Sequence, residues 1–174
     1  MSKSKQADAV SFIERFAQSE QFETLFREGM ALVEETADYL DGRGRSEARN
    51  LKPPLSVIYA TESMRLTTRL LEVASWLVVQ RALRDGEISE AEADEKRARV
   101  KLRSMTRPSH IRQFQDLPDG LRSLIERSFV VTDRLSKIDK MMQSDATDAT
   151  PLNPVADQMQ RLASAFGMGS RATH

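Results

Sequence analysis

The sequence has no cysteine and only two histidines, His110 and His174. The absence of cysteine excludes disulfides, thiolate metal sites and a cysteine nucleophile, and it suits the cytoplasm. Zinc sites and serine–histidine–aspartate triads need correctly placed imidazoles, which this chain can hardly supply. Its seven glycines are scattered and form no phosphate-binding loop. We therefore expect no catalytic site, no metal and no cofactor.

An excess of charge of either sign and a long hydrophobic run are also missing. The 26 basic and 26 acidic side chains balance to a net charge of +0, which argues against a general nucleic-acid binder. The N-terminus lacks the apolar core of a signal peptide, and no uncharged run approaches the roughly 20 residues that span a bilayer. The composition predicts a soluble cytoplasmic protein.

The segment from Pro54 to Arg84 has no glycine, and no proline after its first residue, so it is predicted to form one long helix. At 100° per residue it carries two apolar stripes roughly 120° apart. The first comprises Val57, Ala60, Met64, Thr67, Leu71, Ala74 and Val78, and the second comprises Leu66, Leu70, Val73 and Leu77.

The third arc of this helix changes character along its length. Its first half carries Glu62, Arg65, Arg69 and Glu72, whose spacing predicts ion pairs on the surface and no di-metal site. Its second half carries Trp76, Val79 and Leu83, which need an additional cover. The segment 100–118, with Ile111, Phe114 and Leu117, or the short helix that precedes it, is the candidate cover within the chain.

Two further long helices flank the central one in the sequence. Ser19 and Gly42 delimit the first, and the second runs from Asp119 to Met142 on a heptad seam broken only by Ser128. Ser89 and Glu92 form a capping box for a short helix to about Arg99. We expect an all-α three-helix bundle with a short extra helix, and an up-down-up arrangement is the simplest.

This pattern divides the chain into three parts. Residues 1–18 are a flexible N-terminus with a short amphipathic turn, residues 19–142 are the helical bundle, and residues 143–174 are a disordered tail with a short amphipathic segment. We also expect the stretch 41–54 to be a flexible connection.

Two segments are candidate binding sites. A basic run comprises Lys96, Arg97, Arg99, Lys101, Arg103, Arg107 and Arg112, with no acidic residue among them. It either binds an acidic partner protein or is a solvated face, and nucleic-acid binding through residues 96–112 is the alternative function. The tail stripe Val155, Met159, Leu162 and Phe166 either folds back on the bundle or enters a groove of a partner.

Three strings carry a family resemblance: GMALVEETADYLDG at 29–42, YATESMRLTTRLLEVASWLVVQRAL at 59–83 and DGEISEAEA at 85–93. They resemble the alphaproteobacterial regulator of CtrA degradation family. The resemblance implies a three-helix homodimer with a flexible C-terminal tail and no catalytic residues. A second copy of the chain is therefore the alternative cover for the second half of the central helix, and we favour a dimer interface at Trp76, Val79 and Leu83. It also implies a non-enzymatic adaptor that works with the ClpXP protease and accessory adaptors to deliver substrates such as a response regulator during the cell cycle.

Overall fold

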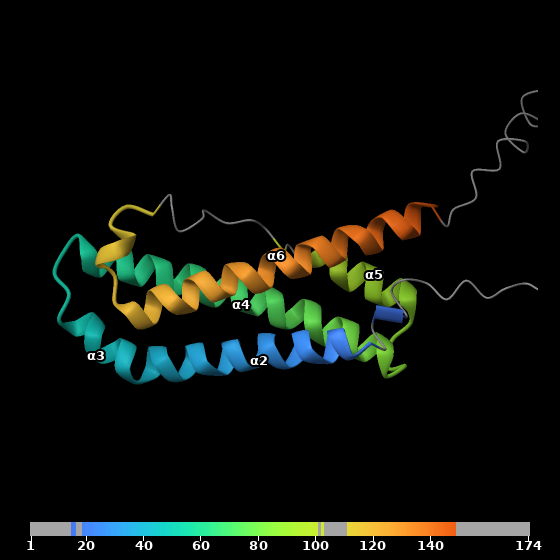
Figure 1. The fold of residues 1–174 in the computed structure, drawn as a ribbon, viewed down its shortest axis with the longest axis horizontal. Coiled ribbons are helices and arrows are strands. Elements are labelled where there is room, and N and C mark those ends of the chain that lie inside the picture. Colours follow the sequence, from blue (N-terminus) through green and yellow to red (C-terminus); the bar gives the residue numbers. More distant parts are fainter. Residues whose placement is uncertain (1–14, 17–18, 101, 103–110, 149–174) are drawn as a thin grey trace, which may run out of the picture.

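The fold is a bundle of long helices in a computed structural model that describes residues 15–16, 19–100, 102 and 111–148, with side chains in α6 as far as Gln143 (Figure 1). The long helices are α2 (Glu20–Asp41), α4 (Leu55–Arg84) and α6 (Asp119–Asp148). The short ones are α3 (Arg43–Arg49), α5 (Glu90–Arg99) and the 3-10 helix η2 (Phe114–Asp116). The predicted all-α fold is confirmed.

Most helix ends lie where the sequence places them. The hydroxyl of Ser19 accepts a hydrogen bond from the Phe22 amide at 3.2 Å, and Gly42 follows the last residue of α2. Ser89 and Glu92 form the predicted capping box at the start of α5. Helix α6 continues to Asp148, past the point where its apolar pattern ends.

The predicted flexible connection between α2 and α4 instead contains α3. Its sequence, RGRSEAR, is rich in good helix formers, and Arg43 pairs with Glu47 one turn later. The Tyr39 hydroxyl of α2 donates a hydrogen bond to Glu47 Oε2 at 2.6 Å and so attaches α3 to the bundle. Burial and this hydrogen bond raise the pKa of Tyr39 above its ordinary value.

The predicted up-down-up order of the three long helices is wrong. Helix α2 is antiparallel to the other two, but α4 and α6 run in the same direction (Figure 1). Arg69 bonds to Ser128 and Trp76 bonds to Asp139, so residue numbers rise together along the pair. A parallel pair needs a connection that travels back about 45 Å, the length of a 30-residue helix. Residues 85–118 provide it, beginning with α5, which packs on α4.

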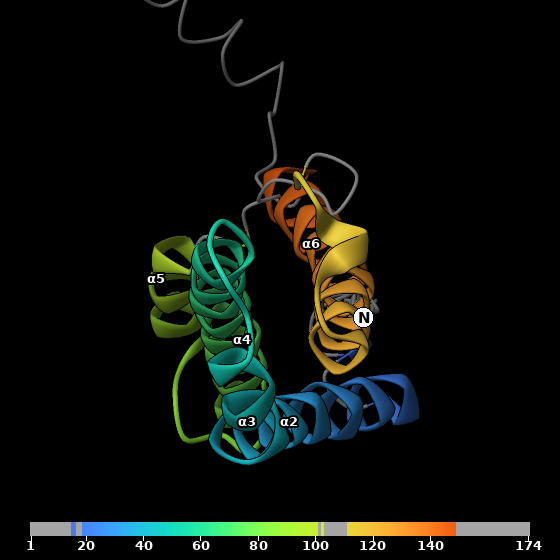
Figure 2. The ribbon, with the colours of Figure 1, turned by 90° about the vertical axis from the view of Figure 1, so that its left-hand side faces the viewer.

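The core contains the second of the two α4 stripes. Leu66, Leu70, Val73 and Leu77 are at most 3% exposed, and they face apolar side chains of both neighbouring helices. Seen along the bundle axis, α2 lies beside both α4 and α6 (Figure 2). The main buried side chains of these two helices are Phe22, Leu25, Leu32, Leu121, Leu124, Ile125 and Leu135.

A buried arginine joins α4 to α6. The predicted surface ion pairing is therefore wrong for Arg69, whereas Arg65 does pair with Glu62. Arg69 is 1% exposed, its Nη1 donates to Ser128 Oγ at 2.7 Å, and its guanidinium lies 3.7 Å from the centre of the Phe129 ring. Burial lowers the pKa of Arg69. Glu62 is buried as well and accepts a hydrogen bond from Arg65. Ser128, the one break in the α6 seam, is therefore the partner of Arg69.

We expect Ser128→Leu to destabilise the protein, although it completes the heptad seam. Leucine removes the acceptor of Arg69 Nη1 and leaves a buried charged donor unsatisfied, at a cost of about 2–3 kcal/mol. Urea unfolding measures the change. Ser123→Leu, at an exposed position of the same helix, should stay within about 0.5 kcal/mol. A stabilised Ser128→Leu protein would show that Arg69 does not need this partner.

The outer edge between α2 and α6 is joined by ion pairs at heptad spacing. Arg127 makes two hydrogen bonds of 2.7 Å to Glu35, and Arg134 pairs with Glu28 at 2.6 Å. The hydrogen bond from Arg127 lowers the pKa of Glu35 and raises that of Arg127. This edge is therefore polar and already paired within the protomer.

The coupling between Glu35 and Arg127 should depend on pH. Because the folded pKa of Glu35 is lowered, its stabilisation is present above the unfolded value of about 4.3 and is lost as the pH falls through the folded pKa. A double-mutant cycle of Glu35→Gln and Arg127→Gln in urea should give at most about 1 kcal/mol at pH 7, because the pair is solvent-exposed. The coupling should decrease as the pH falls through the folded pKa of Glu35 and vanish once its carboxylate is protonated. A coupling that stays the same from neutral pH down to the acid limit of the folded state would contradict this assignment.

Candidate interaction surfaces

The outward side of α4 is an exposed apolar stripe, which we call the α4 stripe. Val57, Met64, Leu71 and Val78 follow one another at intervals of seven and are 62%, 72%, 61% and 51% exposed. Ala60, Thr67 and Ala74 lie between them and complete an a/d heptad pattern. This is the first stripe of the sequence pattern, and within the protomer no described helix covers it. Large apolar side chains exposed in a continuous row mark a protein-interaction surface.

An apolar groove borders the α4 stripe on the side of α2. Val33, Thr36, Ala37 and Leu40 form one wall, and Thr67, Leu70 and Leu71 form the other. The groove encloses about 180 Å³, less than the roughly 300–1,000 Å³ of small-molecule sites. The α2–α4 side of the molecule is thus apolar and open along this groove, whereas nearer the C-terminal end of α4 it is closed by an ion pair between Arg84 and Glu23.

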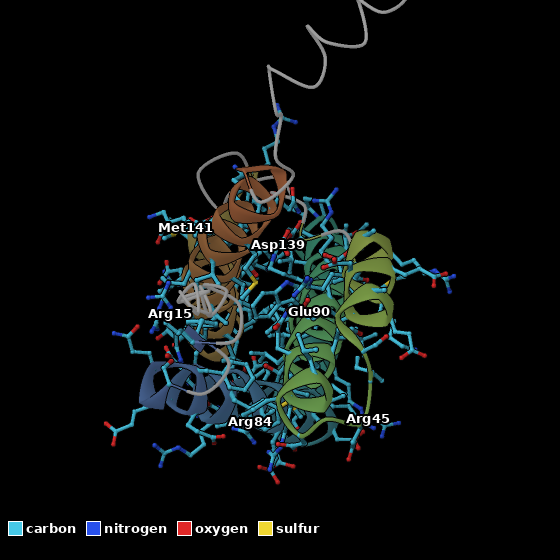
Figure 3. The ribbon with its side chains drawn as sticks, turned by 90° about the vertical axis from the view of Figure 1, so that its right-hand side faces the viewer. Arg15, Arg45, Arg84, Glu90, Asp139 and Met141 are labelled. Carbon is cyan, nitrogen blue, oxygen red and sulfur yellow. The ribbon has the colours of Figure 1, made fainter. Side chains whose placement is uncertain are left out.

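The residues predicted to form a dimer interface lie elsewhere. Trp76 is fully buried inside the protomer, and its indole N–H donates to Asp139 Oδ1 of α6 at 2.9 Å. Asp139 is on the side of α6 that faces α4, whereas Met141 lies on the opposite side (Figure 3). Val79 and Leu83 are half-buried. Trp76 therefore has no surface to offer a second copy, and α6 of the same chain covers it.

The predicted covers from the connecting segment lie at different places along the bundle. Phe114 and Leu117 are buried, but η2 lies at the end of the bundle where α6 begins (Figure 1). Helix α5 packs beside the C-terminal half of α4, which is the half that carries Trp76, Val79 and Leu83.

The basic run is divided by the structure. Arg97 is 9% exposed, pairs with Asp94 and donates to the sulfur of Met142 at 3.8 Å, so it anchors α5 and is not free for a partner. Arg99 is exposed and pairs with Glu95. Lys101 and Arg103 lie outside the described residues, as do the tail positions Val155, Met159, Leu162 and Phe166. Of the four described members of this run, Arg97 and Arg99 are thus paired within their own helix, and Lys96 and Arg112 are exposed.

The comparisons with known proteins place the chain in a family. Residues 13–166 match the model of DUF1465, described as a protein of unknown function. The crystal structure of RcdA from Caulobacter crescentus CB15 is 44% identical to the chain, with a TM-score of 0.60. The match covers 74% of this chain and 96% of RcdA. The chain belongs to the RcdA family. No curated protein matches it.

Membership of the RcdA family confirms the family resemblance seen in the sequence. The chain is therefore a helical protein related to a regulator. The family model spans both the α4 stripe and the groove. The described residues contain no group of three or more histidine, cysteine, aspartate or glutamate side chains placed to hold a metal ion. None of their helices combines the length and apolar character needed to cross a bilayer.

The sequence contained a signal for the exposed stripe of this RcdA-family chain. Helix α4 has two apolar stripes. The buried one consists of Leu and Val, whereas the exposed one, the α4 stripe, alternates large residues with alanine and threonine. The charged arc of α4 is a second signal for the orientation of the helix, because Arg69 in this arc donates a hydrogen bond to Ser128, the polar residue that breaks the apolar seam of α6. Together these two features orient α4 before any coordinates are known.

Proposed function

We propose that the protein is a non-enzymatic adaptor in regulated proteolysis, acting in the cytoplasm with the ClpXP protease. The observation that carries the proposal is membership of the RcdA family, with a match to nearly the whole of RcdA at 44% identity. In this proposal the adaptor and its accessory adaptors help to deliver cell-cycle regulators, such as a response regulator, for degradation.

The exposed apolar surface supports this proposal. An adaptor requires surfaces on which other proteins dock, and the α4 stripe places four large apolar side chains in water. Truncating one central apolar anchor typically weakens a protein interface by more than 1 kcal/mol. The α4 stripe is therefore the surface we assign to protein partners.

We propose that a second copy is one of these partners. The alternation of large residues with Ala60, Thr67 and Ala74 gives the heptad seam through which two helices pack side by side. The small residues between the large ones allow the helix axes to approach closely. In a two-fold dimer the same stripe serves both chains. This interface replaces the one first predicted at Trp76, Val79 and Leu83.

Met64→Arg should convert the dimer into a monomer. Met64 is the most exposed residue of the α4 stripe, and burying an unpaired charge in an apolar seam costs several kcal/mol. Light scattering measures the mass, and circular dichroism checks the fold. The matched control is Val130→Arg, because Val130 is a similarly exposed apolar residue on α6. An unchanged mass for Met64→Arg, or equal dissociation by both variants, would contradict the assigned interface.

The adaptor role predicts a change in the rate of proteolysis. In a reconstituted reaction with ClpXP, accessory adaptors and a response-regulator substrate, the full chain should accelerate degradation. Met64→Arg should reduce the acceleration about tenfold, corresponding to about 1.4 kcal/mol of lost binding, whereas Val130→Arg should retain it. A rate that does not respond to the full chain would refute the adaptor function.

A further inference from the structure

Thr36 of α2 has a buried hydroxyl without a hydrogen-bond partner in the described part of the chain. The residue is 3% exposed and lines the groove between α2 and α4. A buried hydroxyl that bonds to nothing is unfavourable, and native proteins usually satisfy such groups. Thr36 therefore marks the groove as a place where a hydrogen-bonding group is missing from the isolated protomer.

The other helix threonines whose side chains are described show that this arrangement is not the usual one. Each of them donates its hydroxyl to the carbonyl oxygen four residues earlier, the common way to satisfy a threonine in a helix. The distances are 2.8–3.0 Å for Thr24, Thr61, Thr67, Thr68 and Thr132. Rotation about χ1 exchanges the Thr36 hydroxyl with its methyl group, so the hydroxyl is able to turn toward a group that enters the groove.

The residues that line the groove indicate the polarity of the side chain that would fill it. Apart from Thr36 and Thr67 the lining is aliphatic, and the Thr67 hydroxyl is already bonded to Ser63 O at 2.9 Å. The occupant thus needs an apolar body and one polar tip. Tyrosine and tryptophan side chains have this construction, and they are enriched among the anchors of protein interfaces. A phenylalanine fits the walls but leaves the hydroxyl unsatisfied.

The chain has no such side chain available for its own groove or for that of a second copy. Its aromatic residues with a polar group are Trp76, Tyr39 and Tyr59. Trp76 and Tyr59 are buried, and Tyr39 donates its hydroxyl to Glu47. The occupant must therefore come from a different protein. Because Thr67 and Leu71 belong both to the α4 stripe and to the groove, this protein binds in place of the second copy.

The solvent side of the groove indicates the charge of that protein. Glu34 and Asp41 lie one turn before and one turn after Ala37, on the same side of α2. Both are exposed, and neither forms an ion pair within the described residues. Carboxylates on this rim favour a basic residue next to the aromatic anchor.

We propose that the groove between α2 and α4 is the docking site for a partner protein that inserts a tyrosine or tryptophan next to a lysine or arginine. The tip of the aromatic side chain hydrogen-bonds to Thr36, and the basic residue pairs with Glu34 or Asp41. The site deepens the proposed function, since it specifies the chemistry by which an adaptor of this kind recognises a partner.

The test uses p-cresol, which mimics a tyrosine side chain, and toluene, which lacks the hydroxyl. Both are titrated into the full-length protein and followed by NMR at the methyl groups of Thr36, Ala37, Thr67 and Leu71. We expect p-cresol to bind about three- to tenfold more tightly than toluene, the ratio that one neutral hydrogen bond supplies.

Thr36→Val should abolish the preference for p-cresol and raise the melting temperature, because it removes the unsatisfied hydroxyl while keeping the shape. A residue that served stability alone would not change the ratio of the two affinities. The matched control Thr67→Val removes a groove hydroxyl that already has a partner, so the preference should remain.

Tyramine, which adds an ammonium group to the phenol, tests the acidic rim. It should bind more tightly than p-cresol, and Glu34→Gln with Asp41→Asn should remove this gain. Equal affinity for p-cresol and toluene, or no shift at the groove methyl groups, would overturn the proposal. A Thr36→Val protein that changes its oligomeric mass but not its p-cresol affinity would assign the groove to a second copy and overturn it too. These readouts do not involve ClpXP, so a failure of the adaptor function is seen separately in the degradation reaction.

Discussion

The rotation of α4 about its own axis is the constraint on which the structure depends. The helix carries two apolar stripes, and a three-helix bundle with α2 and α6 on one side buries only one of them. The hydrogen bond from Arg69 to Ser128 and the contact with Phe129 turn the charged arc of α4 toward α6. Once that arc is fixed, the leucine stripe lies in the core and the α4 stripe faces outward.

The two outer edges of α2 then acquire different properties. On the side of α6, arginines and glutamates at heptad spacing satisfy one another within the protomer. On the side of α4, one ion pair joins Arg84 to Glu23 at the C-terminal end of α4, and the rest of this side consists of the apolar α4 stripe and the groove. The hydrophobic effect favours covering the second edge far more than the first. The difference between the edges is the physical basis for placing protein partners on α2 and α4.

Most of the fold could be predicted from the sequence, because apolar periodicity and capping residues such as Ser19 and Ser89 fix helices locally. The direction of α6 could not, because it depends on how residues 85–118 travel back along the bundle. The burial of Trp76 followed from that direction, since its partner Asp139 lies on α6. The unpartnered hydroxyl of Thr36 could not be predicted from the sequence, because a threonine in a helix is expected to hydrogen-bond to the carbonyl oxygen four residues earlier.

The central claim is that other protein covers the α4 stripe. Because the chain has no cysteine, a single cysteine can be introduced at a chosen position. The rate at which a thiol reagent labels Met64→Cys measures how far the α4 stripe is covered. Glu126→Cys, at an exposed position of α6, is the reference. At nanomolar protein the two rates should match. At micromolar protein, or with ClpXP and its accessory adaptors, Met64→Cys should react at least about tenfold more slowly, corresponding to about 1.4 kcal/mol of protection. Equal rates under every condition would contradict the account.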